Sequence, residues 1–263
     1  MTILQKTKCY KFKAIYKFIS VIYEFVFNVD TFPFYEFDEE AFAESATKFN
    51  KESLLHIFVI SILYGYYQED FHDNGDFYED KLEWWKELLH EYDIQLKYPD
   101  FDFENESADV GEWYKQNGEA FLDFFKIISD EIVHILFDNM DFLVRFNQRM
   151  SEIVENNNIE NDYNNKINFP KDRMKKDGTI RRCYIPKWVE MAVFYRDYGH
   201  CVFCGCDLTS TISTLNNSNY DHIVPLHKFG INDPCNIQLC CERCNKKKGG
   251  KELIPQYRYQ KRW

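Results

Sequence analysis

The sequence lacks a hydrophobic run long enough to cross a bilayer. Its most apolar segment, Leu54 to Tyr67, has the length of a buried helix and falls short of the roughly 20 residues that a spanning helix needs. The apolar stretch near the N-terminus contains Lys13, Lys17 and Glu24, so we expect no cleavable signal peptide. These features predict a cytoplasmic protein without a membrane partner.

Cysteine is almost absent from the first two thirds of the chain. Cys9 stands alone there, and the other eight of the nine cysteines lie between Cys183 and Cys244. A disulfide framework is typical of short secreted chains with many spread cysteines. Clustering in paired Cys-x-x-C turns instead indicates metal binding in a reducing compartment.

Basic residues are scarce in the first part of the chain. Residues 1–165 contain 14 Lys and Arg against 34 Asp and Glu, whereas residues 166–263 contain 18 against 9. The overall net charge of −11 would by itself argue against a nucleic-acid partner. The average hides an acidic body joined to a basic module, and this asymmetry suggests that the C-terminal end binds nucleic acid.

The spacing of apolar residues divides the chain into three parts. Residues 1–154 are predicted to form an acidic, all-helical domain, and the helical spacing that begins at Phe121 continues in one long segment towards Ile153. Residues 155–180 are rich in Asn and then Lys, which predicts a linker. Residues 181–263 form the third part. The 45% hydrophobic content is ample for a packed core.

Two Cys-x-x-C turns predict a structural zinc site. Zinc in such a site takes four tetrahedral ligands, and each turn places two thiolates on one side of the ion. Cys206 and Cys240 are alternatives, because each lies next to a member of a turn. We prefer Cys241 to Cys240, because Cys240 continues a predicted strand. The predicted ligands are Cys201, Cys204, Cys241 and Cys244.

An Asp-His pair and two asparagines complete the motif. Asp221 and His222 lie between the cysteine turns, Asn236 precedes the second turn, and Asn245 follows its last cysteine. This arrangement resembles the HNH endonucleases, in the variant with Asn in the last position, over about residues 181–263. The resemblance implies a ββα-metal unit, and the overall fold class is then a mainly α N-terminal domain plus a small α+β domain with a zinc knuckle pair. We expect strands at 220–224 and 237–240 and a helix at 242–248.

The resemblance also implies the role of each residue. His222 is expected to be the general base that takes a proton from water. Asp221 and Asn245 are expected to bind one catalytic Mg²⁺, or Mn²⁺ or Ni²⁺ in its place, and Asn236 is expected to hold the loop that aims His222. His227 departs from the pattern. It either contacts the scissile phosphate or the metal, or is simply an exposed loop histidine.

A basic segment follows the last cysteine. Lysines of this kind neutralise phosphates without reading sequence, so DNA is the expected substrate. Aromatic and basic residues after Pro255 extend the segment, although a solvated tail would have the same composition. The predicted nucleic-acid-binding residues are Lys246, Lys247, Lys248 and Lys251.

Three functions fit these features. The first is a metal-dependent DNA endonuclease that nicks one strand at each site, so that cutting both strands needs a homodimer or successive nicks. The second is a zinc-stabilised nucleic-acid-binding or assembly subunit without cleavage activity, and the third is an RNase toxin. The acidic domain is expected to be regulatory or to bind a protein partner, and to screen the basic face until a signal arrives. This architecture is similar to that of effectors of bacterial antiviral defence.

Overall fold

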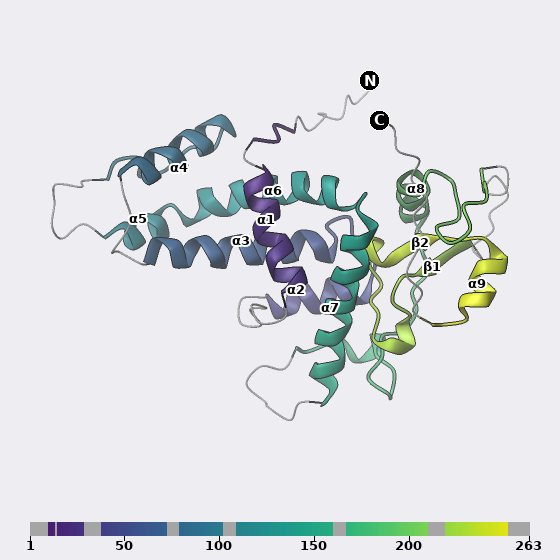
Figure 1. Cartoon of the computed structure of the whole chain (residues 1–263). Coiled ribbons are helices and arrows are strands. Elements are labelled where there is room, and N and C mark those ends of the chain that lie inside the picture. Colours follow the sequence, from purple (N-terminus) through teal and green to yellow (C-terminus); the bar gives the residue numbers. More distant parts are fainter. Residues whose placement is uncertain are drawn as a thin grey trace, which may run out of the picture.

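A computed structural model describes residues 10–13, 15–28, 38–72, 79–101, 109–159, 167–209 and 219–251. The N-terminal helices are α1 (Ile15–Phe27), α2 (Glu39–Thr47), α3 (Leu54–His72), α4 (Glu79–Glu91), α5 (Val110–Gln116), α6 (Gly118–Leu136) and α7 (Met140–Ile159). The C-terminal elements are α8 (Lys187–Arg196), β1 (Tyr220–His222), β2 (Ile237–Leu239) and α9 (Glu242–Lys248). Three short 3₁₀ turns, η2 (Lys171–Arg173), η5 (Leu226–Lys228) and η6 (Pro234–Asn236), lie among them. The predicted fold class is confirmed (Figure 1).

The helical body is built on α3 and α6, which pack along each other. The apolar face of α6 includes Phe121, Phe124 and Phe125, all completely buried. Trp85 of α4 fills the space beside them, and its ring centroid lies 4.9 Å from that of Tyr67 on α3. Burial of large aromatic side chains such as these supplies much of the stability of the body. No helix in the described ranges is long and apolar enough to cross a membrane.

The single long segment expected from Phe121 towards Ile153 is two helices. The chain leaves α6 at Leu136 and begins α7 at Met140. Asn139 sits at the break, where its side-chain oxygen accepts a hydrogen bond of 3.1 Å from the Phe142 backbone N–H. Asparagine is a favoured cap at this position because it satisfies a donor in the first turn, so the apolar period continues across a true helix boundary.

The predicted linker at 155–180 is largely structured where it is described. Its first residues belong to α7, and residues 160–166 lie outside the described ranges. Asn157 accepts a hydrogen bond from Ile167 N (2.7 Å) and donates one to Ile167 O (3.1 Å). Phe169 packs against Phe42 of α2, and Ile180 is completely buried. The asparagines and the few apolar residues therefore fasten this segment to the helical body, which composition alone does not reveal.

The C-terminal part contains the predicted hairpin and helix. Strands β1 and β2 are antiparallel, with Tyr220 opposite Leu239 and His222 opposite Ile237. Each strand is shorter than expected, since the chain turns away after His222 and after Leu239. Helix α9 has the expected bounds. Ile223, the residue that follows β1 in sequence, belongs to the main hydrophobic core, so the hairpin and the helical body share that core.

Candidate functional site

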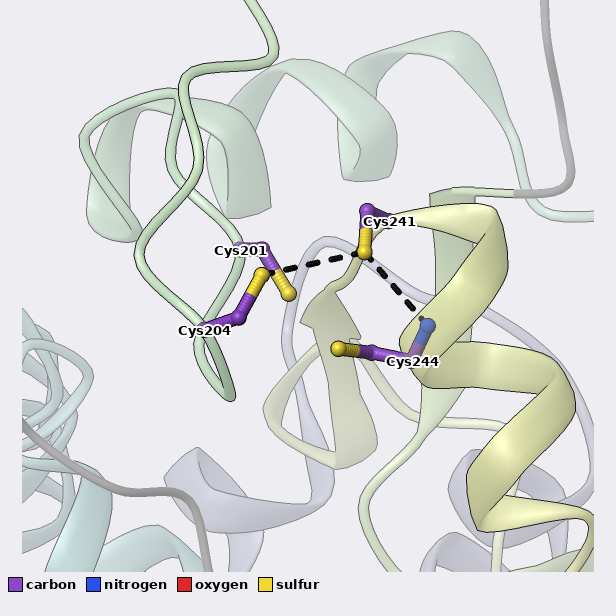
Figure 2. A group of neighbouring side chains, drawn as sticks. All are labelled: Cys201, Cys204, Cys241 and Cys244. Carbon is purple, nitrogen blue, oxygen red and sulfur yellow. Dashed lines mark hydrogen bonds between the residues drawn. The ribbon is translucent and has the colours of Figure 1, made fainter.

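The four predicted zinc ligands converge on one point (Figure 2). Their Sγ atoms all lie within 4.8 Å of one another, and those of Cys204 and Cys241 are 3.8 Å apart. A tetrahedral zinc ion with bonds of about 2.3 Å would hold sulfurs roughly 3.8 Å apart, so the group fits a structural zinc ion. The first pair lies in the turn after α8. The second pair lies at the start of α9, where Cys241 Sγ accepts a hydrogen bond from Cys244 N at 3.4 Å.

The two alternative cysteines differ in their surroundings. Cys240 is completely buried in the core between α8 and the strands, as its place at the end of β2 predicts. Cys206 is exposed and lies beside the cluster, and its backbone carbonyl accepts a hydrogen bond of 3.0 Å from Cys201 N. Although the residue as a whole is exposed, partial desolvation of its thiol, followed by hydrogen bonds with Cys204 and Cys241, raises the pKa of Cys206 to about 12. Neither belongs to the group of four.

His222 ends β1 and is enclosed by the protein. Its Nε2 lies 3.4 Å from Oδ1 of Asn232, and Nδ1 is buried without a hydrogen-bond partner in the described residues. Burial, together with the nearby positive charge of Arg182, lowers the pKa of His222 to about 4, against opposing effects of Asp221 and Asn232. The imidazole is therefore neutral at pH 7, which is the state in which it can accept a proton.

Asn236 closes the loop that follows His222. Its Oδ1 accepts a hydrogen bond from Val224 N (2.9 Å), and its Nδ2 donates to Val224 O (3.1 Å) and Ile231 O (2.8 Å). Gly230 allows the loop to close, because a side chain there would overlap the Val224 carbonyl. These contacts are what a loop-holding role requires. Both the oxygen and the nitrogen of the Asn236 amide are engaged within the loop and do not contact a substrate.

Lys248 corrects one prediction made from the sequence. We expected it to bind nucleic acid, but its side chain is only 1% exposed. Its Nζ donates to Asp221 Oδ2 at 2.5 Å and also to the His222 carbonyl oxygen. A lysine is buried in this way only when its charge is paired. Lys248 therefore joins α9 to β1 and cannot reach a phosphate from this position.

The predicted catalytic metal ligands offer suitable chemistry. Lys248 occupies one carboxylate oxygen of Asp221, while the other, Oδ1, has no hydrogen bond within the described ranges. Asn245 lies on α9, half-buried, one turn before Lys248. A carboxylate oxygen and an amide oxygen are hard donors of the kind that Mg²⁺ prefers. Asp221 and Asn245 therefore carry donors of the chemical kind that a divalent ion takes, and their binding of one ion stays a prediction.

A comparison with protein families agrees with this geometry. Residues 201–251 match the family model described as HNH endonuclease. The C-terminal segment is an HNH domain. The match includes both cysteine turns, the Asp-His pair and both asparagines, and it leaves the helical body and residues 181–200 outside. No curated protein and no solved structure matches the chain.

The remaining lysines of the HNH domain differ from Lys248. Lys246, Lys247 and Lys251 are exposed, and Lys246 pairs with Glu242 at 2.5 Å on the same helix. Exposed pairs of this kind contribute little to stability, so all three remain available to phosphates. The aromatic and basic residues after Pro255 lie outside the described ranges.

His227 is exposed on η5, away from the hydrogen bonds of His222. Its ring packs against Gly250, where an added Cβ would lie 2.6 Å from the His227 Cε1. His227 also lines a cavity of about 600 Å³, together with Arg145 and Gln148 of α7. The structure thus places His227 at the surface, and its contact with a phosphate or metal stays a prediction.

The sequence did not predict that the helical body, α1 to α7, makes hydrogen bonds to the loop at residues 232–236 of the HNH domain. Asn232 donates from its backbone to Ala46 O (2.9 Å) and from its side chain to Thr47 O (3.2 Å), both at the end of α2. Asp233 Oδ2 accepts a hydrogen bond of 2.7 Å from Leu54 N, the first residue of α3. Asn232 is thus held next to His222 by residues more than 180 positions away in sequence.

A second contact joins α7 to the same loop. Asn147 Nδ2 donates to Cys235 O at 2.9 Å, and both side chains are buried. Asp233 is also completely buried, and burial raises its pKa to about 6 although backbone N–H groups of Leu54 and Cys235 oppose the shift. A polar segment such as 232–236 looks like a surface loop in the sequence, so nothing local indicates that it is buried.

Proposed function

We propose that this protein is a metal-dependent endonuclease that hydrolyses phosphodiester bonds of DNA in its HNH domain. The observation that carries the proposal is the match of residues 201–251 to HNH endonucleases, with Asp221 and His222 placed together at the end of β1 and both bound by Lys248 of α9. Lys248 binds both residues and fixes them to α9. A module that only binds nucleic acid needs no base of this kind, whereas hydrolysis needs one to activate water.

Each residue then has a separate task. His222 accepts a proton from the attacking water, and Asn236 keeps the loop after His222 closed. Asp221 and Asn245 would hold a divalent ion, which when bound neutralises charge on the phosphate and the departing oxygen. Exposed lysines such as Lys247 attract the DNA backbone without reading its sequence. The cysteine cluster fixes the start of α9, on which Asn245 lies.

The alternative of a binding or assembly subunit is favoured by one observation. His222 is only 1% exposed, so water must gain access to its ring before the base can act. Cleavage therefore requires that substrate, metal or a partner opens the site. A protein without that opening would bind nucleic acid and remain inactive. An RNase toxin would use the same residues, because attack by an activated water needs no 2′-hydroxyl group.

The helical body completes the proposal. We place it as a support for the loop of the HNH domain, and as the part that would receive a partner or signal if the protein acts in antiviral defence in the cytoplasm. Its contacts with the loop at Asn232 and Asp233 give it a physical route to His222. Two copies of the chain, or two successive nicks, would cut both strands of a duplex.

The test is a nicking assay with supercoiled plasmid. Purified full-length protein, shown to be folded and zinc-loaded, is incubated with Mg²⁺ or Mn²⁺, with EDTA, and as the His222→Ala variant. Metal-dependent conversion to open circles that the substitution abolishes is the expected result. Matched single-stranded DNA and RNA distinguish the nuclease classes. A folded, zinc-loaded protein that binds DNA and cleaves none of these substrates would favour the binding subunit.

A further inference from the structure

Arg182 lies just outside the segment that matches the HNH family, and its backbone is fixed at the candidate site. The Arg181 carbonyl accepts a hydrogen bond of 2.7 Å from Asn232 Nδ2, and the Cys183 N–H donates to Asn232 Oδ1 at 3.4 Å. The same Oδ1 lies 3.4 Å from His222 Nε2. The residues on both sides of Arg182 are thus tied to the side chain that faces His222.

The segment is also anchored on its far side. Arg181 N donates to Arg173 O (2.8 Å), and its Nε donates to Met174 O (2.9 Å). Cys183 Sγ donates to the Thr47 carbonyl at the end of α2. With its neighbours held from three directions, Arg182 has little freedom to leave the site.

The side chain of Arg182 has no partner that would explain its position. Arg182 is exposed, and it makes no ion pair or side-chain hydrogen bond within the described part of the chain. Two other arginines of the C-terminal region do have partners, whereas Arg243 on α9 is, like Arg182, exposed and makes no ion pair in the described residues. Arg196 pairs with Asp197 at 2.8 Å and is buried, and Arg181 binds a carbonyl. An exposed cation whose backbone is tied to Asn232, the residue that faces His222, is available to an anionic ligand at this site.

A phosphodiester supplies such an anion. The guanidinium group is planar and always charged, and its donors match the oxygens of a phosphate better than a lysine does. We propose that Arg182 binds the scissile phosphate and stabilises the negative charge that builds on its non-bridging oxygens during attack. This inference rests on the proposed nuclease function and extends the active site beyond the HNH motif.

The test compares single-turnover nicking by Arg182→Ala, Arg182→Lys and Lys176→Ala. Lys176 is an exposed cation of the same upstream segment and makes no ion pair in the described residues, so its variant controls for the loss of one charge. At saturating protein we expect Arg182→Ala to be about 100-fold slower, as for other lost donors to a transition-state oxyanion. Arg182→Lys should recover part of the rate, and Lys176→Ala should stay within about twofold of wild type. Zinc content and the unfolding midpoint verify that each variant is folded.

Binding to a short duplex, measured against salt concentration, provides the second readout. Loss of one phosphate contact lowers the slope of log affinity against log salt by about 1, and we expect this for Arg182→Ala. A slower rate with an unchanged slope would mean that Arg182 acts only through His222, and an altered slope with an unchanged rate would place it on another phosphate. Either result overturns the proposal. If wild type cleaves nothing, the nuclease function fails by itself, and the slope still decides whether Arg182 contacts phosphate. Should Arg182→Ala not fold, Arg182→Gln replaces it.

Discussion

Replacing Lys248 by methionine distinguishes a residue that holds the site together from one that grips the substrate. The substitution keeps most of the apolar stem and removes the ammonium group, which donates to Asp221 Oδ2 at 2.5 Å and to the His222 carbonyl. Removing one partner of a buried ion pair costs about 3–5 kcal/mol. The Asp221 side chain retains 16% exposure and keeps some hydration, so we expect a loss near the lower end, about 3 kcal/mol.

The assay is urea-induced unfolding of the zinc-loaded protein, with Lys247→Met as the matched control. Lys247 is the exposed neighbour on the same helix, so its variant should change the free energy of unfolding by less than about 0.5 kcal/mol. The order of the two variants should be reversed in DNA binding, where only the exposed lysine should matter. Lys247→Met should reduce the salt slope by about 1, while Lys248→Met should leave it unchanged.

The opposite pattern would refute the reasoning. If Lys248→Met unfolds like wild type and binds DNA with a reduced salt slope, then the lysine reaches phosphate and its pairing with Asp221 is not a stable feature. If both variants are as stable as wild type and neither changes the slope, the ion pair contributes nothing. In each case the assignment of Lys248 as the link between α9 and β1 would be wrong.

Three further predictions concern the zinc cluster and the junction with the helical body. Native mass spectrometry should find one zinc ion per chain, which Cys241→Ser loses and Cys206→Ser retains, because only the former belongs to the group of four. A fragment of residues 166–263 should show no cooperative unfolding and no nicking, because it lacks the helices that cover its part of the main hydrophobic core. A folded, active fragment would instead support the idea that the helical body screens the basic face. Asn147→Leu should lower the free energy of unfolding by about 1–2 kcal/mol, because it loses the hydrogen bond to Cys235. It should also reduce the nicking rate without weakening DNA binding. An unchanged rate would exclude α7 from positioning the loop.

The parts of the site that depend on local spacing could be predicted from the sequence. Two thiolates separated by two residues must face one ion, and a helix that begins at the second pair must carry Asn245 on its first turns. The bounds of α9 and the pairing of β1 with β2 were instead implied by the resemblance to HNH endonucleases, whose domain is a ββα unit.

The buried position of Lys248 could also have been predicted, although the composition of the segment hides it. Three consecutive lysines look alike in composition, but on a helix they point in different directions. Residues three positions apart share a face, so Lys248 shares one with Asn245, which the motif already directs to the site. Helical geometry could therefore have separated Lys248 from Lys247. The segment at 167–180 and the loop at 232–236 offered no such signal, because their burial depends on helices far away in sequence.

The position of these contacts decides how the helical body can influence the HNH domain. The body meets the loop after His222 on its buried side, through α2, α3 and α7. Helix α9, with its exposed lysines, lies on the side of the strands away from the body (Figure 1). The body therefore does not cover the exposed lysines of α9, although Glu152 and Glu155 of α7 line a cavity together with His227, whose ring packs against Gly250. We infer that a partner bound to the body would act by moving the loop at Asn232 and Asp233, which changes the setting of His222 without competing with the substrate.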